Sequence, residues 1–325
     1  MTADNTSWRP GAGLAVMQLR ARMLQQLRAF FAQRGVLEVE TPILQHHAVT
    51  DVHIDSLRVP LDGTDGYLHT SPEYPMKRLL AAGSGPVYQV CKVFRAGEAG
   101  RRHNPEFTML EWYRPGFDHH ALMHELDQLV RALLADAFAL EETCRFSYRD
   151  LFLRYLQLDP FSCSVEELQK QARQQHIDIV SEEAMDRDSW LDLLLTHVIE
   201  PQLPAHRPVF IYDYPASQGA LARLQQQDDI TVASRFELYI NGLELANGYH
   251  ELLDPAEQRR RFERDQQQRR QQGRVVPDID EKFLAALEHG LPDCAGVALG
   301  LDRLLMLACG KDDIRDVLSF SSDRL

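Results

Sequence analysis

The sequence predicts an α+β fold, in which an antiparallel sheet is flanked by helices and carries a helical insertion. Residues 87–94 and 107–113 are two apolar segments joined by a long charged loop, a pattern typical of paired strands. Residues 235–240 alternate between apolar and polar side chains, and Asn241-Gly242 is a hairpin turn signal before residues 243–252. Because strands and helices do not alternate regularly, antiparallel pairing is favoured over a parallel sheet.

Helices and short strands lie on both sides of the long loop. The apolar positions of residues 14–34 recur every three or four residues until Gly35, which predicts an amphipathic helix. Ser71 and Pro72 form a helix start signal, and Asp118 is a helix cap. These signals predict helices at residues 14–34, 71–80 and 118–138 and short strands at residues 36–40 and 67–70.

The second half of the chain opens with a segment of helical pattern. Ser164 and Glu167 form a capping box within residues 145–206, which we interpret as a helical insertion. Residues 1–13 are polar and are expected to form a flexible N-terminal arm before one domain over residues 14–325. The remaining elements are predicted as strands at residues 209–214 and 296–299 and helices at residues 255–274, 280–289 and 301–309.

Composition excludes several classes of protein. The chain has 325 residues, 35 basic and 48 acidic, and a formal net charge of −13. Apolar residues make up 44%, enough for a core, so a disordered acidic chain is excluded, and the negative charge disfavours a nucleic-acid coat. The chain has no run of about 18 apolar residues and no signal-peptide pattern. The five cysteines form no C-x-x-C pair, so we expect a cytoplasmic protein without membrane contact.

Arginine residues gather in the loop between the first two long strands. Arg95, Arg101 and Arg102 stand there with Glu98 and His103. The guanidinium fork matches phosphate oxygens in pairs, so this loop suits a polyphosphate ligand. The alternative for this segment alone is an ordinary solvated loop.

Two glutamates of the later hairpin, Glu244 and Glu251, are seven positions apart. An odd separation places strand side chains on opposite faces, so bringing them together requires an irregularity, which we expect at Asn247-Gly248. Two converging carboxylates suit a divalent cation or an ammonium group. Surface glutamates on an edge strand are the alternative.

Two further segments combine ligand-binding side chains with strands. Phe107, Glu111 and Tyr113 share one strand face, which suits an amine and a stacked base, although a half-buried strand alternates in the same way. Residues 296–303 place small residues at a strand-to-helix switch with Arg303 in the first helical turn. That arrangement permits close approach of an anion, and a tight turn without a ligand is the alternative.

Common nucleophile and metal motifs are absent from the sequence. It contains no G-x-S-x-G, H-E-x-x-H or P-loop pattern. We interpret the adjacent His119 and His120 as solvated side chains, because neighbours on a strand point apart.

In order and spacing, these segments resemble the motifs of class II aminoacyl-tRNA synthetases, specifically the catalytic domain of lysyl-tRNA synthetases. Residues 35–42 resemble motif 1, which builds the dimer interface in that class, residues 94–113 resemble motif 2, and residues 296–303 resemble motif 3.

A closer similarity is to the shortened paralogues that attach lysine to elongation factor P. Their signatures are matched by residues 71–83, 242–252 and 291–300. The anticodon-binding domain of a lysyl-tRNA synthetase does not fit before motif 1, so tRNA is not an expected partner.

The resemblance implies an ATP-dependent ligase that uses Mg²⁺. Such an enzyme forms an aminoacyl-adenylate from (R)-β-lysine and transfers the acyl group to the ε-amine of a lysine on elongation factor P. The family resemblance also implies a homodimer. Positioning and charge neutralisation, more than a general base, would drive the first step, because the attacking carboxylate is already ionised.

Site residues follow from the same resemblance, position by position. Arg95 would hold the α-phosphate, Phe107 and Arg303 would enclose the adenine, and Glu244 would bind the metal. The residues implied to be catalytic are Arg95, Glu244 and Arg303. Further ATP contacts are implied for Ala96, Gly97, Glu98, His103, Asn104, Phe107, Leu245 and Gly300. Substrate contacts are implied for Ser71, Pro72, Glu73, Glu111, Tyr113, Glu251 and Ala298, and metal binding for Glu244 and Glu251.

Two positions depart from the family pattern. Residues 94–98 read Phe-Arg-Ala-Gly-Glu where Phe-Arg-Asn-Glu is common, so Glu98 is displaced by one position. Ala298 stands where synthetases for α-lysine usually have glycine, and we hypothesise that its methyl group favours the β-amino acid. Two alternative functions are a short synthetase that charges tRNA or a small molecule and a non-catalytic amino-acid-sensing paralogue. The retained phosphate and metal residues argue against the second alternative.

Overall fold

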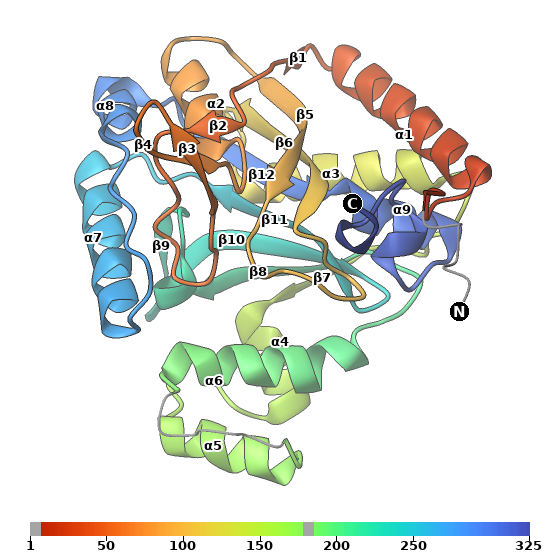
Figure 1. The fold of residues 1–325 in the computed structure, drawn as a ribbon. Helices are drawn as coiled ribbons and strands as arrows, with labels where there is room; N and C mark the ends of the chain where they lie inside the picture. The colour runs from red at the N-terminus through yellow and green to blue at the C-terminus, as the bar shows by residue number, and fades with distance from the viewer. Residues whose placement is uncertain (1–7, 178–184) are drawn as a thin grey trace, which may run out of the picture.

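A nine-stranded sheet forms the centre of the molecule over the parts of the chain that the computed structural model describes, residues 8–177 and 185–325 (Figure 1). Its path runs β1-β5-β6-β12-β11-β10-β8-β7, and β9 pairs with β10 off this path. The strands are β1 (Leu37–Glu38), β5 (Val87–Phe94), β6 (Glu106–Pro115), β7 (Cys144–Ser147), β8 (Val209–Pro215), β9 (Leu224–Gln227), β10 (Ile230–Ile240), β11 (Leu243–His250) and β12 (Cys294–Gly300).

The pairing confirms the predicted α+β class. The central pairs β5–β6, β6–β12, β12–β11 and β11–β10 are antiparallel, whereas β1–β5 and β7–β8 pair in parallel near the sheet edges, so the sheet is mixed. A small second sheet has the order β2-β4-β3, and the strand predicted at residues 67–70 overlaps only its central strand, β4. Its strands are β2 (Leu44–Gln45), β3 (Leu57–Leu61) and β4 (Thr64–Leu68).

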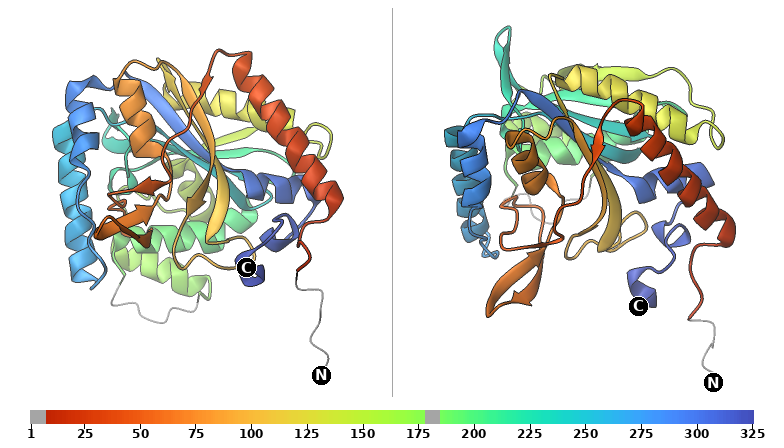
Figure 2. Two further views of the ribbon diagram at one scale, coloured as in Figure 1. Left: turned by 45° about the horizontal axis from the view of Figure 1, so that its top comes forward. Right: turned by 90° about the horizontal axis from the view of Figure 1, so that it is seen from above.

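Helices surround the sheet in three groups. The helices α1, α3 and α9 pack on one face, α2, α7 and α8 gather at one end, and α4, α5 and α6 extend away from β8 and β10 (Figures 1 and 2). Their bounds are α1 (Leu14–Ala32), α2 (Glu73–Ala81), α3 (His119–Leu134), α4 (Tyr148–Leu156), α5 (Val165–Gln174), α6 (Arg187–Leu194), α7 (Pro255–Gln271), α8 (Glu281–Gly290) and α9 (Leu301–Cys309).

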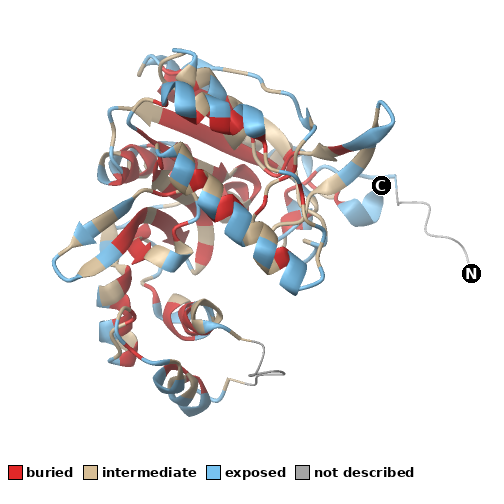
Figure 3. Cartoon of the chain, turned by 90° about the vertical axis from the view of Figure 1, so that its left-hand side faces the viewer, coloured by how far each residue is buried: buried red, intermediate tan, exposed pale blue. Residues whose placement is uncertain are grey.

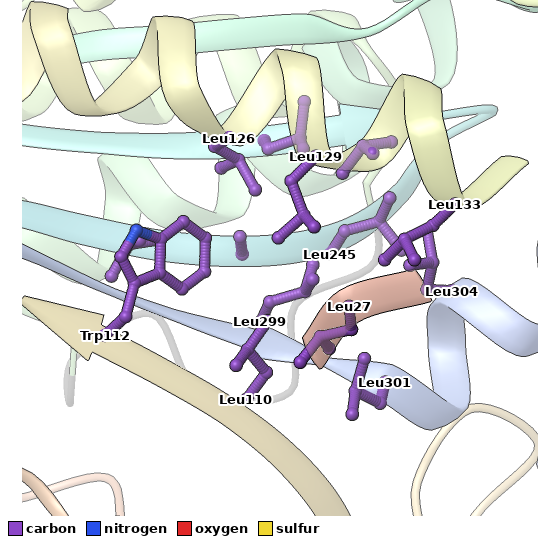
Figure 4. Close-up of a cluster of buried hydrophobic side chains, with 14 of the residues drawn as sticks. Leu27, Leu110, Trp112, Leu126, Leu129, Leu133, Leu245, Leu299, Leu301 and Leu304 are labelled. Carbon is purple, nitrogen blue, oxygen red and sulfur yellow. The ribbon is translucent and has the colours of Figure 1, made fainter. Parts of the chain in front are cut away.

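The main apolar core lies between the sheet and its three-helix cover. Leu27 of α1, Leu126 of α3 and Leu304 of α9 converge on Leu110 and Trp112 of β6 (Figure 4). All five side chains are fully buried, and each contributes about 1.5–3 kcal/mol by leaving water. Because strand side chains alternate, the other row of β6 is left to face the opposite side of the sheet.

The insertion differs from its predicted start. Residues 144–147 form β7, which pairs in parallel with β8, so the first helix begins at Tyr148, capped by the Ser147 hydroxyl. The buried Trp190 of α6 and Tyr148 of α4 pack with β8 and β10 in a second core. Figure 3 marks the buried residues of these elements in red. Part of the predicted insertion, residues 178–184, lies outside the described residues.

The N-terminal segment is partly fixed to the fold. The backbone N–H groups of Gly11 and Ala12 donate to the carbonyls of Ser319 and Leu318, and Ala12 is buried. These residues therefore differ from the predicted flexible arm, of which residues 1–7 lie outside the described residues. The single domain over residues 14–325 stays a prediction.

The interpretation of the adjacent histidines as solvated is wrong for His119. This residue is 1% exposed, and its Nε2 lies 3.1 Å from Asp213 Oδ1. His119, His120 and Asp213 offer ligand atoms within 4.8 Å of one another. His119 Nδ1 has no hydrogen-bond partner among the described residues, so the ring lacks the outer hydrogen bond that orients metal-bound histidines, and we interpret the group as a hydrogen-bonded cluster.

The helices of the described residues include none with the length and apolar character needed to cross a membrane.

Candidate active site

A cavity of about 810 Å³ opens on the face of the sheet opposite the main core. It is lined by the outward row of β6, by β10, β11 and β12, and by the start of α2 and residues of α6 and α7. Fifteen of the eighteen predicted site residues line it: Ser71, Glu73, Arg95, Glu98, His103, Asn104, Phe107, Glu111, Tyr113, Glu244, Leu245, Glu251, Ala298, Gly300 and Arg303. The predicted residues thus meet in one space although they are spread over more than 230 positions.

Three predicted residues do not line this cavity. Ala96 donates its N–H to the carbonyl of Asp55, and Gly97 adopts a φ of +78° that a side chain would strain. Pro72 occupies the N-cap position of α2. Their predicted contacts with ATP and substrate stay predictions.

One end of the cavity, which we call the arginine end, is formed by Arg95, Arg102 and Arg303. The guanidinium of Arg95 lies 5.1 Å from the centre of the Phe107 ring, and its Nη1 is 3.8 Å from Glu98 Oε1. Arg95 Nε is buried and has no hydrogen-bond partner among the described residues. A buried donor without a partner is costly, so the site favours an anionic acceptor here.

Arg303 is held at the rim of the arginine end by two neighbours. It donates to the backbone carbonyl of Glu244 over 2.8 Å and to Nε2 of His103 over 2.7 Å. Burial and the charge of Arg303 lower the pKa of His103, which keeps its ring neutral and able to accept this bond. The planar guanidinium of Arg303 thus has a fixed orientation next to the cavity.

The opposite end, which we call the acidic end, is formed by Glu73, Glu111 and Glu251 with Tyr113 and the buried Lys77. Tyr113 donates to Glu111 Oε1 over 2.6 Å, and Glu111 Oε2 has no partner in the described chain. Burial, followed by the charge of Glu73, raises the pKa of Glu111 to about 8. Burial also raises the pKa of Glu251 to about 7. The acidic end therefore has three carboxyl groups, and Lys77 is the cation that pairs with two of them.

The carboxylates predicted to act as a pair are separated. Glu251 Oε2 lies 2.5 Å from Lys77 Nζ, whereas Glu244 Oε2 lies 3.5 Å from Arg303 Nη1. The strand irregularity that turns Glu244 toward the cavity is real, but it lies at Leu245 and not at Asn247-Gly248. In the β10–β11 pairing Leu238 opposes Ala246 and the next residue opposes Glu244, which leaves Leu245 as the extra residue.

The carboxylate that acts most strongly on Glu244 is Glu237 of β10, which the sequence analysis missed. Burial and then the charge of Glu237 raise the pKa of Glu244. Glu237 itself accepts hydrogen bonds from Arg235, Tyr214 and Tyr239. A hairpin places residues of its two strands side by side. Because Glu237 and Glu244 lie on either side of the predicted Asn241-Gly242 turn, the sequence could have predicted that they are close together.

Lys77 is the other functional candidate that the sequence analysis missed. It stands four residues after Glu73 on α2, a spacing that predicts an ion pair on one helix face. Its second partner, Glu251, is far away in the sequence, so that contact depends on the fold.

Comparison with known proteins shows which family this chain belongs to. The sequence profile described as tRNA synthetases class II (D, K and N) matches residues 7–324. The chain is 48% identical to the elongation factor P–(R)-β-lysine ligase of Edwardsiella ictaluri over 99% of both chains. It is 50% identical to the protein of that name from Proteus mirabilis over 98% of both chains, and 49% identical to that of Haemophilus influenzae over 99% of both.

Proposed function

Because this chain belongs to the class II tRNA synthetases, within the family of elongation factor P–(R)-β-lysine ligases, we propose that it joins (R)-β-lysine to a lysine of elongation factor P at the expense of ATP. One observation of the structure carries this proposal furthest. A single cavity presents a buried donor, Arg95 Nε, at one end and a buried acceptor, Glu111 Oε2, at the other, and neither has a hydrogen-bond partner among the described residues. Such a cavity fits a reaction between a nucleotide phosphate and an amino acid with extra amines.

The first step would be formation of an aminoacyl-adenylate. A carboxylate oxygen of the amino acid attacks the α-phosphorus of ATP, the bond to the β-phosphate breaks, and pyrophosphate leaves. Arg95 would hold the α-phosphate and stabilise the charge that develops on it, while Phe107 and Arg303 enclose the adenine and His103 and Asn104 line the phosphate side. The attacking carboxylate is already ionised, so this step requires positioning rather than a base.

Mg²⁺ fits the arginine end through Glu244. This carboxylate is open to the cavity, its contact with Arg303 is long at 3.5 Å, and Glu237 adds negative charge beside it. A bound Mg²⁺ would neutralise phosphate charge there. Glu237 already accepts three hydrogen bonds, so we propose that it attracts the ion through its negative charge and that Glu244 is the ligand. Glu251 is paired with Lys77, and we therefore propose it for substrate binding instead of metal binding.

The acidic end would receive the amines of the substrate. Glu111, Tyr113 and Glu251 would bind ammonium groups, and Ser71 and Glu73 would seat the part of the substrate next to its carboxylate. In the second step the ε-amine of the acceptor lysine, after loss of a proton, attacks the adenylate carbonyl. An amide bond forms, the bond from the carbonyl carbon to the phosphate oxygen breaks, and AMP leaves.

A homodimer is proposed from the motif 1 region. Residues around β1 and β2 expose three large apolar side chains, with exposed fractions of 56% for Leu37, 39% for Ile43 and 41% for Leu44. Exposed apolar side chains clustered in one segment mark an interaction surface. Sedimentation at micromolar concentration tests this proposal, and a Leu37→Glu variant should shift the population to monomer.

The proposed acceptor distinguishes this function from tRNA charging. Labelled (R)-β-lysine, ATP and Mg²⁺ are incubated with the protein and either elongation factor P or total tRNA. Label on elongation factor P, abolished by replacing the acceptor lysine, supports the proposal. Label on tRNA alone contradicts it, and no pyrophosphate exchange at all points to the non-catalytic alternative. We place this reaction in the cytoplasm, where its proposed acceptor serves translation.

A further inference from the structure

Lys77 is a buried cation between two carboxylates. Its side chain is 1% exposed, and Nζ lies 2.6 Å from Glu73 Oε1 and 2.5 Å from Glu251 Oε2. Lysine is almost never fully buried without a partner, because removing an ammonium group from water is costly. Although burial lowers the pKa of Lys77, the charges of Glu251 and Glu73 raise it overall, so this ammonium is permanent.

The acidic end contains one carboxylate more than Lys77 contacts. Glu111 interacts electrostatically with Glu73, Glu251 and Lys77, so the four side chains form one group. When ionised, three carboxylates and one ammonium leave two net negative charges. A diamino acid whose carboxylate is bound as the adenylate brings two positive charges. The two sets of charges therefore cancel among side chains that are largely buried, where an unbalanced charge is costly.

We propose that Lys77 is a positioning residue that fixes Glu73 and Glu251 and sets the charge of the acidic end to match a substrate with two ammonium groups. This inference rests on the proposed function, because it concerns the substrate half of the same cavity. Lys77 is inside the wall and contacts the carboxylates, so it acts through them. Lys77 is not among the site residues predicted from the sequence.

The charged and titratable groups around Lys77 come from several elements. They are Glu73 on α2, Glu251 after β11, Glu111 and Tyr113 on β6, and Cys294 on β12. The Phe283 ring of α8 closes another side at 5.9 Å. Burial raises the pKa of Glu111 to about 8 and that of Glu251 to about 7, so both carboxyls titrate close to neutral pH. A diammonium substrate requires them ionised, so its binding should release protons.

Removing the ammonium should make this ionisation harder. In Lys77→Met the neighbouring carboxylates lose their permanent counter-charge, so their pKa values rise further. The pH at which kcat/KM for (R)-β-lysine reaches half its plateau should move up by about one unit. Near pH 7 kcat/KM should fall about tenfold, mainly through KM, and part of this loss should be recovered at pH 9. The KM for ATP should not change, because the arginine end is untouched.

The test measures pyrophosphate exchange with (R)-β-lysine from pH 6 to 9 in the wild-type chain, Lys77→Met and Lys77→Arg. Lys170→Met is the matched control, because Lys170 is exposed on α5 outside the cavity. Lys77→Arg keeps the charge and should keep the wild-type midpoint. An equal loss at every pH in Lys77→Met, or a profile like the wild type, overturns the inference.

A measurement on the wild-type chain tests the inference without depending on how the variants fold. Calorimetric titration with (R)-β-lysine at pH 7 in two buffers of different ionisation enthalpy should show release of about one proton per substrate. No proton release overturns the charge-matching argument. Failure of the wild-type chain to exchange pyrophosphate with (R)-β-lysine would instead contradict the proposed function, so the two failures are distinguishable.

Discussion

Gly296 of β12 lies directly opposite Tyr113 of β6, so closely that a Cβ atom at position 296 would be 2.2 Å from the Tyr113 ring. The same Cβ would be 2.5 Å from Glu251 Oε1. Only the absence of a side chain lets these two substrate-facing groups occupy the floor of the acidic end. The glycine that opens the third family motif is thus required by close packing within the site.

Gly296→Ala should therefore damage substrate binding. The added methyl group must displace Tyr113 and Glu251, at a cost of about 1–3 kcal/mol. We expect kcat/KM for (R)-β-lysine in pyrophosphate exchange to fall at least about tenfold, with a smaller effect on ATP. Gly13→Ala is the control, because a Cβ there meets nothing within 4 Å. Full activity in Gly296→Ala would show that the acidic end tolerates this displacement.

Arg303→Ala should impair adenylate formation. The variant loses the guanidinium that is oriented by Glu244 and His103 beside the proposed adenine site. Loss of one such charged group costs about 10²–10³ in rate for reactions that depend on charge stabilisation. Arg101→Ala controls for the general loss of positive charge, because Arg101 is exposed in the loop that carries His103 but does not line the cavity. A similar loss in both variants would remove the specific role of Arg303.

Ala298→Gly should change the choice between lysine isomers. Ala298 lines the cavity and pairs with Glu111 across the β6–β12 ladder, so its methyl group is beside the proposed amine site. Removing one methyl group from a pocket wall changes discrimination by about 1–3 kcal/mol. We expect relative activation of α-lysine to rise at least about fivefold, measured by pyrophosphate exchange with each isomer. An unchanged ratio would refute the hypothesis.

Glu244→Gln should raise the Mg²⁺ requirement of adenylate formation. Its carboxylate is the proposed ligand, and loss of its charge weakens cation binding. The half-saturating Mg²⁺ concentration should rise at least about fivefold, with a smaller rise in Glu237→Gln, where only nearby charge is lost. Glu142→Gln, at an exposed position outside the cavity, should behave as the wild type. Equal Mg²⁺ dependence in all four proteins would exclude this cation site.

Glu111→Gln should stabilise the fold at high pH while abolishing activation of (R)-β-lysine. Folding raises the pKa of Glu111 from 4.5 to about 8, so the folded state holds a proton that the unfolded state has lost in this range. Stability from this group is therefore present at low pH and decreases as pH rises from about 4.5 to 8. At pH 8 the variant should be more stable by about 1–2 kcal/mol, and at pH 4 the difference should vanish.

The comparison is made by thermal unfolding at both pH values. Glu166→Gln, at an exposed position of α5, serves as the control and should show no such pH-dependent gain. Stabilisation of Glu111→Gln that is equal at pH 4 and pH 8 would assign the effect to packing instead of ionisation.

Local signals predicted much of the fold. The apolar strands β5, β6, β11 and β12 and the capped starts of α3 and α5 depend on residues next to one another, and the structure confirms them. Strand β9 has the sequence Leu-Gln-Gln-Gln and no apolar period, so only its pairing with β10 makes it a strand. The short β7 likewise exists because β8 offers it an edge.

The site was predictable where contacts follow sequence order, and not where the fold brings distant residues together. The bulge at Leu245 arises from the register between two strands, which no residue of the Asn247-Gly248 pair reveals. Similarly, the pairing of Glu251 with Lys77 could not be read from either segment alone. The spacing of Glu244 and Glu251 predicted that an irregularity was needed, but not which carboxylate would approach which cation.

The two rows of β6 have a practical consequence for redesign. One row, with Leu110 and Trp112, belongs to the main core, and the other, with Glu111 and Tyr113, faces the reactants. A library that randomises this strand would alter specificity at the positions of one row and destabilise the fold at the positions of the other. Efforts to make the enzyme accept other amino acids should begin instead at Ala298, where a side chain reaches the cavity without belonging to the core cluster.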